Sequence, residues 1–386
     1  MVPPGATSQG RALGDRSSHR GPCRAEFRPL GVLFASRSPN PWARRRPNVS
    51  ASLPRPLGDA TSALVAVAER LNALPGRLHD ERPQLEHAVS VVVEAAGELE
   101  RQCAGAPVRL RDAQLAFRHQ AGPLLTKSWI IERSIMKPCG YPGDHELLDA
   151  FYTRRVSGGT VGGLLDVLVL DCDAGRAVVD RKRHVARWLT ERLASRPNAK
   201  VVDLACGPCR LEKNLLDTGI GGAARFVAVD GDEQALAYAN RVLGGTSRVE
   251  LWQDNAIRIA RDPKVPACLA DADHVVSLGL FDYLPDRIAA RLLRALRRAT
   301  RAGGELLVGN FAADNPSRIF MEWFGAWSLI HRSEREFLAL FEEAGFASAE
   351  LRVEREAEGG SVLLVTARCG GERSEVKRGR GVEASA

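Results

Sequence analysis

The chain has 386 residues, of which 45% are hydrophobic and 26% charged, so it is long and apolar enough to form a substantial core. No uninterrupted apolar run reaches the length of a membrane-spanning helix, and we expect no membrane span. The net charge of the chain is +7. Residues 1–58 contain ten arginines and two acidic residues, which gives this segment a net charge of +8 and leaves −1 for the other residues. A nearly neutral body argues against a nucleic-acid partner.

Both ends of the chain have the composition of disordered tails. Residues 1–58 are rich in Arg, Pro, Gly and Ser and lack an apolar period, and residues 370–386 are also polar. The first tail resembles an organelle transit peptide, and the alternative is an upstream extension with no targeting role. It has no apolar core of the kind that follows the charges of a secretory signal.

The eight cysteines are scattered, and only Cys206 and Cys209 lie close together. They suggest neither a disulfide framework nor the four-ligand spacing of a zinc site, so we expect no metal. This usage suits a reducing compartment, and we expect a cytoplasmic protein.

Residues 59–195 are predicted to form a helical N-terminal module. Apolar residues recur at helical spacing from Leu64 to Leu71 and from Leu85 to Ala96, and further helices are expected from Leu147 and over 177–193. The segment 136–146, MKPCGYPGDHE, is too rich in Gly and Pro for a helix interior. We expect it to form a turn that folds over the following domain as a lid.

Residues 196–369 alternate between strands and helices. Strands are predicted at 200–205, 226–230, 249–253, 273–278, 305–310, 348–353 and 362–367, and helices at 233–242, 255–261, 285–299 and 335–344. Alternation implies a mainly parallel sheet, whereas the short turn before the last strand makes the final pair antiparallel. This predicts an α/β fold with a Rossmann-like, seven-stranded methyltransferase sheet whose last strand is antiparallel.

The most informative stretch is VVDLACGPCR, residues 201–210. A strand that enters a glycine turn and then a helix brings backbone N–H groups close to a ligand at the carboxyl edge of the sheet. Gly207 leaves room for that approach, and Asp230, at the end of the second strand, can accept both ribose hydroxyls of an adenosine.

Three interpretations of this stretch compete. An NAD site would need three glycines in a G-x-G-x-x-G pattern, and the stretch has one. Cys206-Gly-Pro-Cys209 resembles a thioredoxin active site, although no Trp precedes it and the order of strands and helices does not fit. The third interpretation, motif I of a class I methyltransferase, agrees best with the context.

Two further segments follow strands at matching positions. Asp254-Asn255-Ala256 follows the third strand, where an acid can contact an adenine amine, although Asp254 could equally be a helix N-cap. Residues 277–283, SLGLFDY, follow the fourth strand, on the side of the methyl group to be transferred.

These motifs, with GYPGD (140–144), GLFDYLPDR (279–287) and NPSR…MEW…W.LI.R (315–332), resemble class I S-adenosylmethionine-dependent methyltransferases. The likeness, over about 125–368, is to the bacterial enzymes of 3-hydroxypalmitic acid methyl ester biosynthesis. It implies S-adenosylmethionine as the cofactor and a lid contact from Gly143 and Asp144. The implied cofactor-binding residues are Tyr141, Asp203, Ala205, Cys206, Gly207, Asp230, Gly231, Asp254, Asn255, Ala256, Ser277 and Gly279. Cys209 stands where a smaller residue is expected.

The resemblance also implies a small-molecule acceptor, with an acyl carboxylate as one option. Its pocket would include Tyr283, Trp323, Trp327, His331 and Arg332, although the two tryptophans could be core residues and His331 a structural one. An ionised carboxylate needs no general base, whereas an alcohol or amine would need one.

The expected catalytic residues are Tyr283 and His331, with Asp282 as a further base and Arg332 as the group that holds an anion. The alternatives are methylation of another natural product, of RNA or of protein, thiol–disulfide exchange, and a binding module without turnover.

Overall fold

A computed structural model describes residues 53–73, 82–157, 160–220, 222–357 and 359–370. The predicted tails therefore lie outside the described residues, except that helix α1 begins at Arg55, four residues before the start expected from the sequence. Within the described ranges, none of the helices is both long enough and apolar enough to cross a bilayer.

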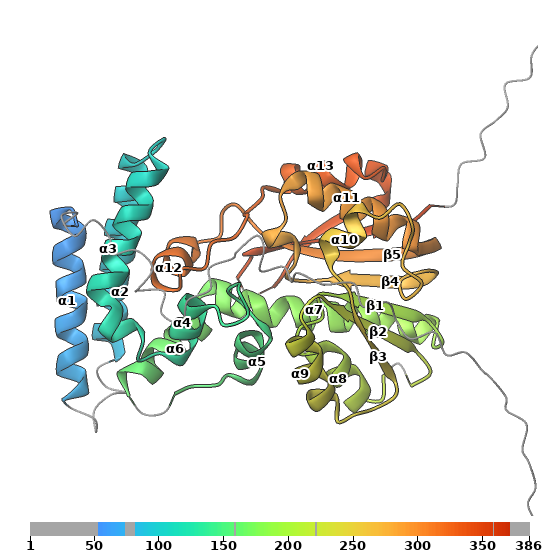
Figure 1. The fold of residues 1–386 in the computed structure, drawn as a ribbon, viewed down its shortest axis with the longest axis horizontal. Coiled ribbons are helices and arrows are strands. Elements are labelled where there is room, and N and C mark those ends of the chain that lie inside the picture. The colour runs from blue at the N-terminus through green and yellow to red at the C-terminus, as the bar shows by residue number, and fades with distance from the viewer. Residues whose placement is uncertain (1–52, 74–81, 158–159, 221, 358, 371–386) are drawn as a thin grey trace, which may run out of the picture.

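Seven strands form one sheet in the order β3-β2-β1-β4-β5-β7-β6 (Figure 1). The strands β1 to β5 pair in parallel, whereas β7 pairs antiparallel with both β5 and β6. The strands are β1 (Lys200–Leu204), β2 (Arg225–Asp230), β3 (Val249–Gln253), β4 (Ala272–Ser277), β5 (Thr300–Phe311), β6 (Leu351–Arg355) and β7 (Val362–Arg368). This is the predicted methyltransferase topology, and the fold prediction is confirmed.

Helices cover both faces of the sheet because each face is apolar. On one face pack α10 (Ala256–Arg261), α11 (Asp286–Ala299) and α13 (Glu334–Glu343), whose side chains share a core with β1, β4, β5 and β7. On the other face pack α7 (Asp173–Ser195), α8 (Arg210–Asp217) and α9 (Glu233–Leu243). With a core on each side, the sheet is a fixed platform for the loops at its carboxyl edge.

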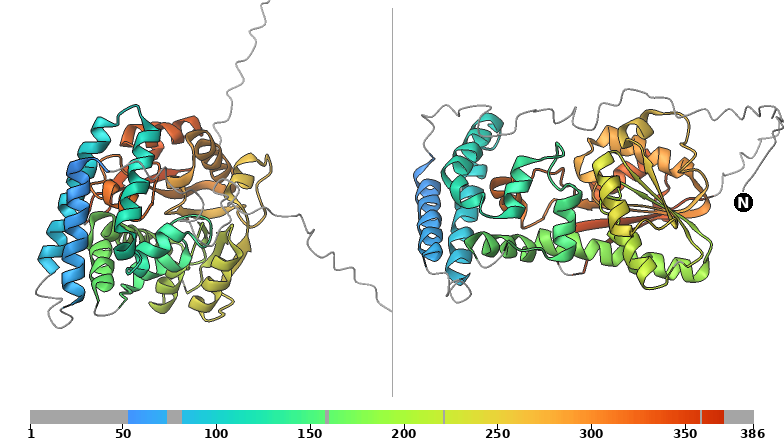
Figure 2. Two further views of the ribbon diagram at one scale, coloured as in Figure 1. Left: turned by 60° about the vertical axis from the view of Figure 1, so that its left-hand side comes forward. Right: turned by 60° about the horizontal axis from the view of Figure 1, so that its bottom comes forward.

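The N-terminal helices form a separate layer beside the sheet, and Figure 2 shows α7 running from this layer along the sheet. They are α1 (Arg55–Asn72), α2 (Arg82–Gln102), α3 (Pro107–Leu125), α4 (Trp129–Met136), α5 (His145–Thr153) and α6 (Val161–Asp171). A helix from the C-terminal half, α12 (Arg318–Phe324), packs against α2 and α3. Its Trp323 is fully buried and donates a hydrogen bond to Glu100 at 2.8 Å.

Some elements differ from those predicted. Strand β5 begins at Thr300, five residues early, and residues 348–350 form a 3-10 turn (Ser348–Glu350) before β6. Another short 3-10 turn, Phe281–Tyr283, follows β4. Helices α6 and α12 were not predicted, because both are apolar around most of their circumference and so lack a clear amphipathic period.

Candidate functional site

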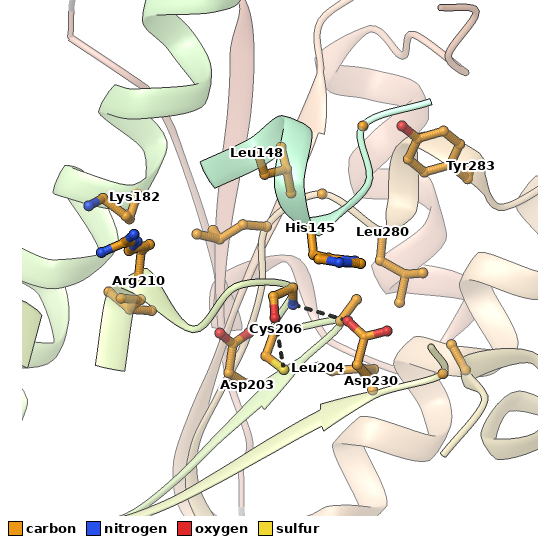
Figure 3. Close-up of a pocket in the computed structure, with 18 of the residues that line it drawn as sticks. His145, Leu148, Lys182, Asp203, Leu204, Cys206, Arg210, Asp230, Leu280 and Tyr283 are labelled. Carbon is orange, nitrogen blue, oxygen red and sulfur yellow. Dashed lines mark hydrogen bonds between the residues drawn. The ribbon is translucent and has the colours of Figure 1, made fainter. Parts of the chain in front are cut away.

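A pocket of about 1190 Å³, partly open to solvent, lies at the carboxyl edge of the parallel strands. Figure 3 shows Asp203 and Asp230 at the strand ends, His145 and Leu148 on α5 across from them, Lys182 and Arg210 on one side and Tyr283 on the other. Its lining includes twelve of the residues expected from the sequence: Tyr141, Gly143, Asp203, Ala205, Cys206, Gly207, Asp230, Gly231, Asp254, Ala256, Gly279 and Tyr283.

The loop after β1 turns sharply at the base of the pocket. Ala205, Gly207 and Cys209 all have positive φ, at 60°, 54° and 51°. The N–H of Gly207 donates to Asp230 at 3.0 Å, so motif I and the second strand are directly joined. Residues without a Cβ adopt this conformation most readily, which accounts for glycine at 207.

Asp230 is 8% exposed and lies at the end of β2. Its two oxygens accept backbone hydrogen bonds from Gly207 at 3.0 Å and from Asp232 at 2.9 Å. Burial raises the pKa of this carboxyl, and the two backbone hydrogen bonds oppose the rise. The side chain is held in one orientation at the pocket wall, where hydroxyl donors of a ligand can reach it.

Of the predicted ligand residues at the ends of β3 and β4, some line the pocket and others do not. Asp254 lines the pocket, and both of its oxygens are paired with Arg258. Asn255 does not line it and caps α10 by accepting from Ile257 and Arg258. The hydroxyl of Ser277 is fully buried and donates to Leu204 at 2.9 Å. The contacts of Asn255 and Ser277 are therefore structural, in place of the ligand contacts predicted from the sequence.

The GYPGD turn contributes Tyr141 and Gly143 to the pocket lining and is anchored at its C-terminal end. Asp144 caps α5 by accepting from Leu147 at 2.9 Å and pairs with Arg133 at 2.8 Å. At Gly143, φ is +74°, and a Cβ would lie 2.5 Å from Trp327 Cζ2. Only glycine fits there, because the backbone is left-handed and the indole ring fills the space.

Two carboxyl groups share the wall beneath motif I. Burial raises the pKa of Asp203 well above its usual value, and the neighbouring Glu212 adds to the effect. The pKa of Glu212 is also raised by burial. Burial therefore favours the protonated form of these carboxyls, and a bound cation such as an ammonium group would favour the ionised form.

Arg181, on α7, is a site residue that the sequence reasoning missed. It lines the pocket and is 3% exposed, yet its Nε and Nη1 atoms are buried without a hydrogen-bond partner. The nearest carboxylate, Asp282, lies 3.7 Å away, and burial raises the pKa of Asp282 to about 6. A buried guanidinium with unused donors beside a cavity is suited to an anionic ligand. The amphipathic pattern of α7 suggested only a solvent-facing arginine.

Four of the five expected acceptor residues, Trp323, Trp327, His331 and Arg332, do not line this pocket. Arg332 is 2% exposed and donates to Phe281, Leu284, Asn310 and Asp286, which leaves it no free donor for an acceptor. All five donors of Arg332 thus bind within the protein, and its role in holding an anion stays a prediction.

Neither His331 nor Trp323 lines the pocket. Burial lowers the pKa of His331 to about 4, and the ring lies 3.2 Å from the side chain of Asn315. Trp323 is a core residue of the helical layer.

Tyr283 lines the pocket, and Trp327, which lines a second cavity, is hydrogen-bonded to it. The Tyr283 hydroxyl donates to the carbonyl of Pro142 at 2.7 Å and accepts from Trp327 Nε1 at 2.9 Å. Burial raises the pKa of Tyr283 above its usual value. A phenol that is protonated and already hydrogen-bonded to the lid positions the lid, and is poorly suited to accept a proton from a substrate.

Behind Trp327 lies a second, smaller and almost wholly apolar cavity, which is also partly open to solvent. It is bordered by helices of the N-terminal layer, α7, β5 and α12. Its lining includes Ile131, Phe151, Val178, Phe311, Met321 and Trp327. Val178 precedes Arg181 by one helical turn on α7, and the Arg181 guanidinium lies 5.7 Å from the centre of the Phe311 ring. The Arg181 guanidinium therefore lies where the first pocket and the apolar cavity approach each other.

The cysteine pair is poorly suited to redox chemistry. Its mutual hydrogen bond and burial raise the pKa of the Cys206 thiol well above its usual value. The hydrogen bond with Cys206 lowers the pKa of the Cys209 thiol, but burial and nearby acids outweigh this effect and raise the pKa to about 12. Thiol–disulfide exchange needs an accessible thiolate, and Cys209 is fully buried.

Comparison with known proteins agrees with this geometry. Residues 201–304 match the model of a family described as a methyltransferase domain. The matched segment is similar to a methyltransferase domain. No curated protein matches the chain.

Among solved structures, a possible exported protein from Bordetella parapertussis is similar over 86% of this chain and 100% of its own length, with a TM-score of 0.55 and 19% identity. At that identity the likeness shows the fold alone. The magnesium protoporphyrin IX methyltransferase of Synechocystis, solved with bound S-adenosylhomocysteine, covers 50% of this chain and 84% of its own, at 16% identity and a TM-score of 0.37. That value is too low to carry an argument about this chain.

The methyltransferase domain places S-adenosylmethionine-dependent methyl transfer ahead of the other enzyme classes considered above. The matched segment runs from β1 into β5 and contains motif I, Asp230 and Asp254.

Proposed function

We propose that this protein is an S-adenosylmethionine-dependent methyltransferase that esterifies the carboxylate of a small acceptor with an apolar tail. The observation that carries the proposal is the buried Arg181 guanidinium, whose Nε and Nη1 atoms make no hydrogen bond and which lines the cofactor pocket at the approach to an apolar cavity.

The pocket suits S-adenosylmethionine in both shape and charge. Asp230 would accept the ribose hydroxyls, and Asp203 would face the ammonium group of the methionine part. The turn at Gly207 would let the backbone approach the ligand closely. The lid residue Tyr141 lies over the same pocket, and its pKa is raised by burial and by Asp230.

The acceptor side suits an acid with an apolar tail. Arg181 has donors for a carboxylate, and the cavity behind Trp327 exposes almost no polar surface. Val178 and Arg181 lie on the same face of α7, so a tail would run along Val178 when its head binds Arg181. Apolar groups enter such a cavity at a gain of about 0.8 kcal/mol per methylene.

The proposed methyl transfer needs no general base from the protein. S-adenosylmethionine supplies a methyl group that is already activated by the positive sulfur. Arg181 would hold the acceptor carboxylate, which is ionised at neutral pH and needs no proton removed. Alignment of the acceptor oxygen with the methyl–sulfur bond can contribute about 7–11 kcal/mol in the best cases. The lid of Tyr141 and Gly143 would exclude water from the site.

The first test is a binding screen in which the purified full chain is titrated with S-adenosylmethionine, S-adenosylhomocysteine and NAD by calorimetry. We expect the first two to bind and NAD not to bind. NAD binding without S-adenosylmethionine binding would overturn the proposal.

The second test uses mass spectrometry to follow methyl transfer to a series of carboxylic acids of increasing chain length and to their amides. We expect product only from the acids, with KM falling as the chain lengthens. In Arg181→Met, KM for the acid should rise at least tenfold while the Kd for S-adenosylhomocysteine changes less than threefold. The opposite pattern would assign Arg181 to the methionine carboxylate instead.

We also propose a cytoplasmic location. It is supported by the seven cysteines of the described residues, all of which are free thiols.

A further inference from the structure

Three potential metal ligands converge beside the cofactor pocket from segments far apart in the chain. Cys139 belongs to the lid turn, His145 is the first residue of α5, and Asp232 is the N-cap of α9. One donor atom from each lies within 4.8 Å of the other two. The His145 Nδ1 and Asp232 Oδ2 atoms are 3.7 Å apart.

Two of these atoms are buried and lack a hydrogen-bond partner. His145 is 4% exposed, and its Nδ1 atom makes no hydrogen bond, although Asp232 Oδ2 lies 3.7 Å away. The Oδ2 atom of Asp232 is also unpartnered, although its Oδ1 atom accepts from the Gln234 N–H at 2.9 Å. At 3.7 Å the two atoms are too far apart to share a hydrogen. Buried polar atoms are seldom left in this state, and a cation between them would satisfy both.

We propose that Cys139, His145 and Asp232 bind a zinc ion. Zinc takes sulfur, imidazole and carboxylate ligands in a tetrahedral arrangement, with bonds of about 2.0–2.3 Å that place neighbouring ligand atoms about 3.3–3.7 Å apart. The histidine–aspartate edge, at 3.7 Å, needs to shorten by a few tenths of an ångström, and the edges to the Cys139 thiol, which lie within 4.8 Å, by up to about 1 Å. Magnesium and calcium prefer all-oxygen sites, so a thiol and an imidazole select against them.

The surrounding charge favours a dication. Asp230 is linked to the backbone of Asp232, and the nearby cation Arg133 is already paired with Asp144 and Glu146. A thiolate and a carboxylate would together neutralise Zn²⁺.

The ion would join the lid to the loop after β2. Cys139 lies just before the GYPGD turn, and Asp232 lies two residues after Asp230, whose carboxylate it contacts through its N–H. Figure 3 shows His145 on the side of the pocket toward Asp230. Zinc would thus fasten the lid over the part of the pocket formed by the end of β2, a role separate from methyl transfer.

The test is direct metal binding by the full chain in the absence of any methyl donor. After dialysis against a chelator, the chain is titrated with zinc by calorimetry and with cobalt(II) by absorption spectroscopy. We expect one tight site for each metal and a thiolate-to-cobalt charge-transfer band. Cys139→Ser should abolish the band, and Asp232→Asn should weaken binding about 100-fold or more. The asparagine retains the capping oxygen of α9, so the fold should survive.

Cys268→Ser is the matched control, because Cys268 is a free cysteine that lies outside the cluster. It should leave both titrations unchanged. Unaltered zinc affinity in Cys139→Ser and Asp232→Asn would overturn the proposal. So would a charge-transfer band that persists in Cys139→Ser and disappears only when Cys206 and Cys209 are replaced. Thermal unfolding of each variant without metal separates loss of the site from loss of the fold.

Discussion

Replacing Asp230 by alanine should nearly abolish cofactor binding while leaving the protein folded. The carboxylate is fixed by the N–H groups of Gly207 and Asp232 and lies at the pocket wall. Hydrogen bonds to a charged group contribute about 1.5–3 kcal/mol each. Loss of two bonds to ribose hydroxyls would therefore cost about 3–6 kcal/mol, which corresponds to a Kd on the order of 10²–10⁴ times higher.

The folded state should lose much less. Alanine leaves the N–H groups of Gly207 and Asp232 without their acceptor, but the pocket is open to water, which can replace it. We expect a loss of about 1–2 kcal/mol in the free energy of unfolding, at the lower end of the cost of an unpaired donor.

Calorimetric titration with S-adenosylhomocysteine measures the effect on binding, and chemical denaturation measures the effect on stability. The control is Asp217→Ala, which removes an exposed acid from α8, where it pairs with Lys213. This variant should bind like the unaltered protein. A Kd for Asp230→Ala within threefold of the unaltered value, in a protein that is still folded, would refute the ribose assignment.

Three other changes test the remaining features. Cys209→Ala should leave the methyl transfer rate within about threefold, since the thiol is buried and protonated, whereas an enzyme of thiol chemistry would lose its activity in an insulin-reduction assay. Val178→Phe should fill part of the apolar cavity and raise KM at least tenfold for long-chain acids, with short acids little affected; equal effects on both would argue against a tail site. Burial raises the pKa of Asp282 from 3.8 to about 6, so the ionised carboxylate is less stable in the folded than in the unfolded chain. Ionisation of Asp282 should therefore destabilise the fold above pH 6, and this effect should disappear as the pH falls toward 4. The unfolding free energy of the unaltered protein minus that of Asp282→Asn should then rise on the order of 3 kcal/mol from pH 7 to pH 4, and a flat difference would show that Asp282 ionises normally.

Periodicity and motif spacing predicted most of the sheet, because parallel strands buried on both faces are short apolar runs with turns at their ends. The segment FVAVD, for example, corresponds to β2 within one residue. The prediction was weaker for α12. This helix is apolar on nearly every side because it lies between the N-terminal helices and the sheet, and nothing local in the sequence indicates that location.

The candidate site was predicted unevenly for a related reason. Residues that directly follow strands, such as Gly207 and Asp230, share one edge of the sheet and could be found from their positions. Arg181 and His145 come from helices, and only the tertiary structure brings them to the pocket. Arg332 was assigned a ligand role from the resemblance of its segment, whereas in the structure its donors hold the loop after β4. A surplus of unused donors distinguishes Arg181 from Arg332, and sequence alone does not reveal it.

Helix α12 has a consequence for engineering this protein. It is encoded after β5, yet Phe320 and Phe324 both line the apolar cavity and pack with the helices encoded first. Exchange of the N-terminal helices with those of a relative would therefore leave part of a shared wall mismatched. A chimera that is meant to change acceptor preference should carry the cavity-lining segments 130–178 and 320–327 from the same parent.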